Sequence, residues 1–336
     1  MSLAVGCSLL GVAALSQSIA VKLGFLEGVE DETIFGRPVE SAQWGFYLGP
    51  FAPLRGYVAY EVLRCCLVHL GAWVALGGVK WSLLEKDAKA RSVLARSVMN
   101  VLFLGACGWR GIRMWQDFWK QARPVNIMQA LDSKASLAFV PPTPHARLYS
   151  HYPDFQRLSS VMAAFQLKNL VDTVVYGDGI LFFVHHLITI TTAVLALYPF
   201  AHFHGTFFFG VSETSTTLLA VLVNFDKNFG VPTLERDYPE TRKLIGGIFA
   251  ISFIVVRAFL WPIGAYFFIK DCLHVLKADT AHDRVVVWCF VWMLLTLSVM
   301  QAIWLVEILL TVYREVIKPV LSRSSSSSSS SSSKAD

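Results

Sequence analysis

Long apolar blocks recur along this sequence, each close to 20 residues in length. A helix of about 20 residues rises about 30 Å, which matches the thickness of the hydrocarbon core of a bilayer. The chain is 54% hydrophobic and only 16% charged, whereas a typical soluble domain has about 25% charged residues. The sequence therefore predicts an all-α protein, a multi-pass transmembrane helical bundle.

The apolar blocks predict about eight membrane helices. They cover residues 3–20, 57–79, 93–109, 158–176, 180–198, 203–224, 244–269 and 285–313. The first two belong to an N-terminal region over 1–92, and the other six form one domain over 93–315. The first block lacks the basic start of a secretory signal, so we expect a membrane helix, with a removed or peripheral segment as the alternative. The serine-rich residues 316–336 are expected to form a disordered tail.

Two connections between the blocks are very short, at residues 177–179 and 199–202. Short connections force antiparallel neighbours, so the blocks over 158–176, 180–198 and 203–224 should form one contiguous layer. Pro262 predicts a kink in the block over 244–269. Loop charges do not decide the orientation, because lysine and arginine divide almost equally between the two sides.

Charge and cysteine usage argue against several classes of protein. The net charge of +5 is scattered through loops instead of forming a basic face with interleaved aromatics, so we expect no nucleic-acid partner. The six cysteines show neither metal-ligand spacing nor a disulfide framework. The histidines near the apolar blocks are fewer than a membrane di-iron site requires. We therefore expect neither a metal nor another cofactor.

Several ionisable and polar residues lie inside the predicted helices. An ionisable group at membrane depth costs about 2.5–3.5 kcal/mol even on the lenient insertion scale, whereas an interhelical hydrogen bond returns only about 0.6 kcal/mol. Packing alone is the alternative, but this imbalance favours a central cavity lined by polar groups. Asp172 or Glu213 could neutralise Arg257. The other predicted lining residues are Thr189, Ser215, Thr216, Asn224, Gln301 and Trp304.

The adjacent histidines His185 and His186 are the candidate catalytic residues. A histidine can act as a general base near neutral pH, and Asp172 or Glu213 could orient its ring. Adjacent residues point about 100° apart on a helix, so only one of the two histidines can face a nucleophile.

Taken in order, these landmarks resemble the TLC domain, which is shared by translocating-chain-associating proteins, ceramide synthases and several lipid-regulating proteins. The series begins at Asp172 and His185–His186 and ends with Gln301-Ala302-Ile303-Trp304, within about residues 93–315. Between them lie Glu213, Ser215, Thr216, Asn224 and Ser252-Phe253 leading to Arg257. The resemblance implies six helices around a central, lipid-accessible cavity, in the endoplasmic reticulum or a related membrane.

The resemblance also bears on activity. Ceramide synthases in this family place a His-His pair in one helix and a His-Asp pair in the next, for acyl transfer from acyl-CoA to a sphingoid amine. This chain has the first pair, but Ser212–Glu213 stands where the second is expected. It therefore resembles the non-synthase branches, which implies binding or regulation of membrane lipids in phospholipid or sphingolipid homeostasis. The alternative is a membrane acyltransferase that uses the His-His pair and acyl-CoA.

Overall fold

The computed structural model describes residues 52–79, 84, 88–121, 141, 143–226 and 229–318. The predicted helix over 3–20 and residues 319–336 of the predicted serine-rich tail lie outside these residues. The domain boundaries drawn at residues 92 and 316 stay predictions.

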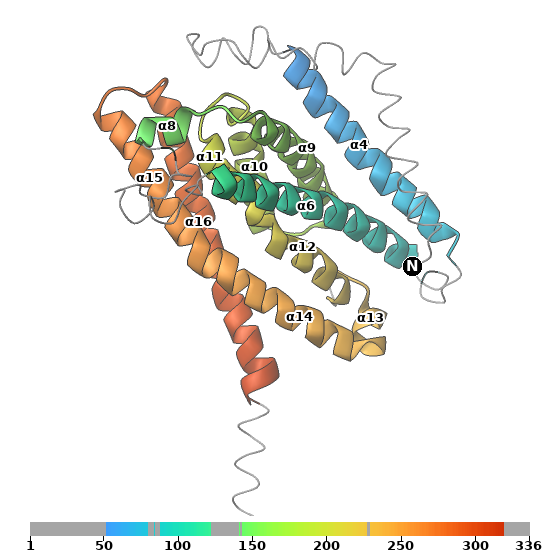
Figure 1. The fold of residues 1–336 in the computed structure, drawn as a ribbon. Coiled ribbons are helices and arrows are strands. Elements are labelled where there is room, and N and C mark those ends of the chain that lie inside the picture. The colour runs from blue at the N-terminus through green and yellow to red at the C-terminus, as the bar shows by residue number, and fades with distance from the viewer. Residues whose placement is uncertain are drawn as a thin grey trace, which may run out of the picture.

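Within the described ranges all regular secondary structure is helical, which confirms the predicted fold class (Figure 1). No strand is found in this part of the chain. The helices are α4 (Ala52–Gly77), α6 (Ala88–Gln121), α8 (Pro144–Tyr149), α9 (Pro153–Tyr176), α10 (Ile180–Leu195), α11 (His202–Gly205), η1 (Thr206–Val211), α12 (Glu213–Leu222), η2 (Val223–Phe225), α13 (Pro232–Asp237), α14 (Pro239–Phe253), η3 (Ile254–Leu260), α15 (Trp261–Lys277), α16 (Arg284–Val312) and η4 (Tyr313–Ile317).

Five helical stretches in the described part are long and apolar enough to cross a membrane, so the chain is an integral multi-pass membrane protein. They are Val58–Gly77, Lys89–Phe118, His202–Phe225, Pro239–Lys277 and Arg284–Glu315. The helix α10 is apolar but has only 16 residues. The helix α9 has 24 residues, and many of its buried side chains are polar.

The helices α9 and α10 pack together as a hairpin, as the short connection at 177–179 predicts. Gly177 caps α9 with a φ of 71°, and Gly179 precedes α10 with a φ of 101°. A residue with a side chain rarely adopts these angles, so the two glycines allow the chain to reverse within three residues.

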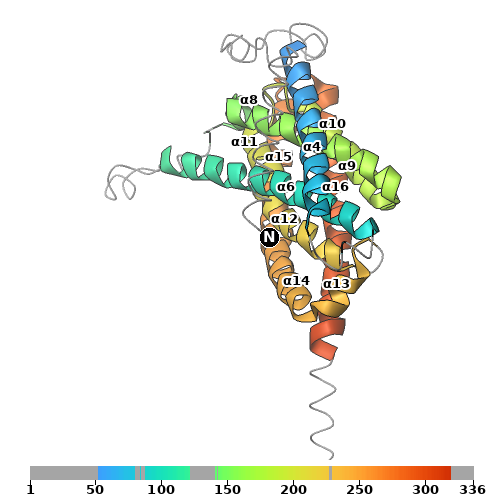
Figure 2. The same cartoon turned by 90° about the vertical axis from the view of Figure 1, so that its right-hand side faces the viewer.

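The prediction of a contiguous three-helix layer is wrong for its third member. The segment formed by η1 and α12 packs mainly on α6, whereas α10 packs on α9 and α16. Glycines explain this choice of neighbour, because a Cβ added at Gly210 would lie only 2.5 Å from the Cα of Gly111. Small residues of this kind let two membrane helices approach to backbone contact. Figure 2 shows α6 crossing the bundle at a large angle to α4 and α16.

Two of the membrane-spanning stretches contain a π-helical segment in their interior, apart from η4 at the end of the last stretch. One is η1, directly before α12, and the other is η3, directly before α15. The irregularity expected from Pro262 thus lies in the preceding turns, over η3, where the proline ring would clash with an α-helical carbonyl. Segments of π-helix occur frequently at functional sites, and these two carry the chain into and past the cavity described next.

Candidate functional site

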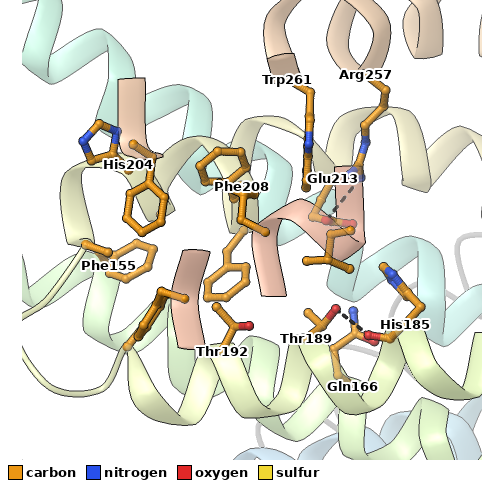
Figure 3. Close-up of a pocket in the computed structure, with 18 residues that line it drawn as sticks. Phe155, Gln166, His185, Thr189, Thr192, His204, Phe208, Glu213, Arg257 and Trp261 are labelled. Carbon is orange, nitrogen blue, oxygen red and sulfur yellow. Dashed lines mark hydrogen bonds and ion pairs between the residues drawn. The ribbon is translucent and has the colours of Figure 1, made fainter. Parts of the chain in front are cut away.

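A partly open cavity lies inside the bundle, between α9, α10, α16 and the two stretches that contain η1 and η3 (Figure 3). The space between its lining atoms, including its mouth, is about 660 Å³. Most of the wall is apolar, and polar groups stand at its two ends. The lining residues are Phe155, Gln166, His185, Thr189, Thr192, Ala196, Ala201, His204, Gly205, Phe208, Phe209, Glu213, Arg257, Trp261, Phe268, Phe290, Leu294 and Leu297.

One polar end is built on an ion pair between Glu213 and Arg257. The Nη2 of Arg257 lies 3.4 Å from the Oε1 of Glu213, and each residue is only 8% exposed. Glu213 is the first residue of α12, and Arg257 lies in the middle of η3. The sequence thus offered two candidate partners for Arg257, and the structure pairs it with Glu213.

Further contacts hold the guanidinium of Arg257 in place. Its Nη2 donates to the carbonyl of Ser212 at 3.1 Å and to the hydroxyl of Thr216 at 2.8 Å, while Nε reaches the hydroxyl of Ser215 at 3.4 Å. The guanidinium also lies 5.0 Å from the ring centroid of Trp261, a cation–π contact. No described residue accepts a hydrogen bond from its Nη1, so one donor remains for a ligand.

This ion pair lies deep in the membrane. Glu213 follows the start of its membrane-spanning stretch at His202 by eleven residues, which is about 16 Å of helix. The hydrocarbon core is about 30 Å thick, so the pair is near the middle of the bilayer.

The histidine pair lies across the cavity from Glu213 and Arg257, on α10, and its two members have different surroundings. His185 lines the cavity (Figure 3), and its Nδ1 is buried without a hydrogen-bond partner. Its ring packs edge-on against Trp304, at a centroid distance of 5.4 Å. The Nδ1 of His186 instead lies 2.6 Å from the Oε1 of Gln166. Within the described ranges, neither histidine is hydrogen-bonded to a carboxylate.

Asp172 belongs to a separate ionic network away from the cavity. Its carboxylate pairs with Lys168 one turn earlier on α9, and it lies 3.5 Å from the Nε of Arg96. Arg96 also binds Asp178 at 2.5 Å, at the turn between α9 and α10. This network joins α6 to the α9–α10 hairpin.

The predicted lining residues fall into three groups. Thr189 and Arg257 line the cavity. Ser215, Thr216 and Trp304 contact groups that line it. Asn224 donates to the hydroxyl of Ser97 at 2.7 Å, joining the end of the α12 stretch to α6, and Gln301 is buried on α16.

Sequence reasoning missed the polar group at the other end of the cavity. His204 lines this end, and its Nε2 lies 3.0 Å from the Oδ2 of Asp271 on α15. Arg147 on α8 forms a bidentate pair with the same carboxylate, at 2.7 and 2.6 Å. Its Nη1 donates to the carbonyl of Pro141 at 3.0 Å. Asp271 and His204 lie near the ends of apolar blocks, and this position is the only feature of the sequence that indicates a polar group there.

His202, close to His204 in sequence, has a structural role. The backbone N–H of Tyr152 donates to its Nδ1 at 3.1 Å. The Nε2 therefore carries the proton, and it lies 3.0 Å from the carbonyl oxygens of both Ala196 and Tyr198. His202 thus fixes the connection between α10 and α11. In the part of the chain that the structure describes, no group of three or more histidine, cysteine or acidic residues could hold a metal ion.

Comparison with known proteins gives a match to a family. The model of one family, described as the TLC domain, matches residues 97–310, which contain the whole of the described cavity lining. No curated protein and no solved structure matches the chain.

Proposed function

The chain belongs to the TLC-domain family, and from this premise we propose that it binds a membrane lipid in its cavity and so regulates phospholipid or sphingolipid homeostasis. The observation that carries this proposal is the set of unused polar atoms at mid-membrane depth. The Nδ1 of His185 is buried without a partner in the cavity wall, and Arg257 keeps a donor opposite it.

Unused polar atoms at this depth need a reason. A buried group without a hydrogen bond costs about 1–3 kcal/mol, and the bilayer core offers no water to satisfy it. The phenylalanine and leucine side chains along the cavity provide a wall suited to an acyl chain. A bound lipid would bury its chain there and place a polar group against His185 and Arg257, which accounts for both features. An endoplasmic reticulum or related membrane is the location we propose.

The geometry gives less support to the acyltransferase alternative. A histidine that acts as base is usually oriented by a third group, and the two candidate carboxylates are engaged elsewhere. Glu213 is paired with Arg257, and Asp172 is paired with Lys168. Acyl-CoA is therefore a partner only under the acyltransferase alternative.

Native mass spectrometry combined with lipid analysis of the purified protein tests the proposal. We expect intact lipid to remain bound to the wild-type protein, and His185→Ala to retain less of it. His186→Ala, which removes a side chain bonded to Gln166, is the matched comparison and should retain more lipid than His185→Ala. Steady acyl transfer from acyl-CoA to an amine or hydroxyl, lost in His185→Ala, would instead establish the enzyme.

A further inference from the structure

The cavity has a second polar end at His204, Asp271 and Arg147. His204 precedes Glu213 by nine positions, which is about 13 Å along a helix. Figure 3 shows His204 at the opposite end of the cavity from His185 and Arg257, with Phe155 beside His204 and Phe208 between the two ends. His204 is 7% exposed, and Phe268 packs edge-on to its ring at 5.3 Å.

The hydrogen bond to Asp271 fixes the tautomer of His204. Asp271 is held by two charge-assisted bonds from Arg147, so its carboxylate is ionised and can only accept. The Nε2 of His204 must therefore carry the proton that it donates to the Oδ2 of Asp271. A neutral ring with a proton on Nε2 presents Nδ1 as a hydrogen-bond acceptor. No described residue donates to this Nδ1.

Charge balance keeps the ring neutral. Asp271 and Arg147 already cancel each other, so a proton on Nδ1 would add an uncompensated charge to a buried site, which is costly. Each of the three guanidinium nitrogens of Arg147 donates one hydrogen bond, to Asp271 or to the carbonyl of Pro141, and its charge is balanced by Asp271. This end of the cavity consequently offers an acceptor and no spare cation.

We propose that His204 forms a recognition site for a hydroxyl group of an uncharged lipid, whose apolar part lies along the phenylalanine wall between this site and the polar group held at His185 and Arg257. The inference rests on the proposed function, since it requires that the cavity hold a lipid. A hydroxyl donates to Nδ1 without bringing a charge. A phosphate would meet the carboxylate of Asp271 with no free cation to neutralise it, and an ammonium group would bring an unbalanced positive charge.

The test compares hexadecan-1-ol with its methyl ether, which has the same chain but no donor. Both are titrated by native mass spectrometry against the full-length protein purified in detergent. A hydrogen bond to a buried acceptor predicts that the wild-type protein binds the alcohol up to about tenfold more tightly than the ether. His204→Phe keeps a ring of similar size without the acceptor, and it should reduce this ratio to about one. Hexadecyl phosphate should bind less tightly than the alcohol.

Each outcome decides a different claim. Equal binding of alcohol and ether by the wild-type protein overturns the inference, whether or not His204→Phe folds. The same holds if His204→Phe keeps the preference, or if the alkyl phosphate binds most tightly. The variant Thr192→Trp fills the cavity and separates the two claims. If the alcohol and the ether bind the wild-type protein equally, and Thr192→Trp abolishes the binding of both, the inference fails and the proposed function stands. If neither probe binds the wild-type protein, both are overturned.

Discussion

Glu213 and Arg257 are paired at one end of a membrane-embedded cavity, with the Nη2 of Arg257 3.4 Å from the Oε1 of Glu213. Each residue lies at or within an irregular stretch of helix, Glu213 just after η1 and Arg257 inside η3. The two stretches come from different parts of the chain, so the ion pair joins them at the level of the cavity. The same pair joins the two stretches and leaves the Nη1 of Arg257 as a hydrogen-bond donor for the proposed lipid.

Removing one partner of this pair should be more harmful than removing both. Arg257→Met leaves the carboxylate of Glu213 buried without its cation, and breaking a buried pair in this way costs about 3–5 kcal/mol. The double variant Glu213→Gln/Arg257→Met leaves no buried charge and should recover much of that loss. Thermal unfolding of the three proteins in detergent measures the difference. A double variant as unstable as Arg257→Met would contradict the pairing.

The close approach of α6 and η1 predicts a strong effect of a single methyl group. Gly111→Ala would place a Cβ against the backbone of Gly210, so the two helices must separate and lose contact along their length. We expect overpacking of this kind to destabilise the protein by about 1–3 kcal/mol. Gly247→Ala on α14 is the matched control, because a Cβ there meets nothing within 4 Å. Equal unfolding temperatures for the two variants would show that α6 and η1 are not in backbone contact.

His202 should behave as a structural histidine. His202→Ala removes the acceptor of the Tyr152 N–H and the donor to the carbonyls of Ala196 and Tyr198. Leaving buried backbone groups unsatisfied costs about 1–3 kcal/mol each, so the unfolding temperature should fall markedly. The control is His274→Ala, since His274 is exposed on α15. A His202→Ala protein of normal stability would contradict this role.

Acidification should weaken the α8 end of the bundle through His282. The ring packs against Tyr198 and Phe200, and its Nδ1 lies 2.9 Å from the hydroxyl of Tyr149. Burial lowers the pKa of His282 to about 4, while the unfolded chain should titrate near 6.5. Between these values the unfolded state binds more protons, so the free energy of unfolding falls as the pH falls from about 6.5 to about 4.

The contribution of His282 can be isolated with His282→Gln. This variant should lose part of the decrease in unfolding temperature between pH 6.5 and pH 4. An identical pH dependence in the two proteins would assign the effect to other groups.

Much of the fold follows from local sequence, but the packing of the helices does not. Apolar length located the helices, although α6 extends beyond the block over 93–109 at both ends, because its polar ends also form helical turns. The Glu213–Arg257 pair could be foreseen, since a buried carboxylate needs a cation. The choice between α6 and α10 as neighbour of α12 depends on Gly111 and Gly210 meeting, and these residues are 99 positions apart. The Arg147–Asp271–His204 cluster likewise joins three distant segments, so no local pattern announces it.

The most direct test of lipid binding in the cavity uses two adjacent threonines on α10. Thr191 and Thr192 each donate to the carbonyl four residues earlier, at 2.9 and 2.8 Å, but only Thr192 lines the cavity, while Thr191 is exposed. Native mass spectrometry of the purified variants counts the lipid molecules that each retains. Thr192→Trp should release the bound lipid, and Thr191→Trp should retain it as the wild-type protein does. Equal lipid retention by the two variants would contradict a lipid site in this cavity.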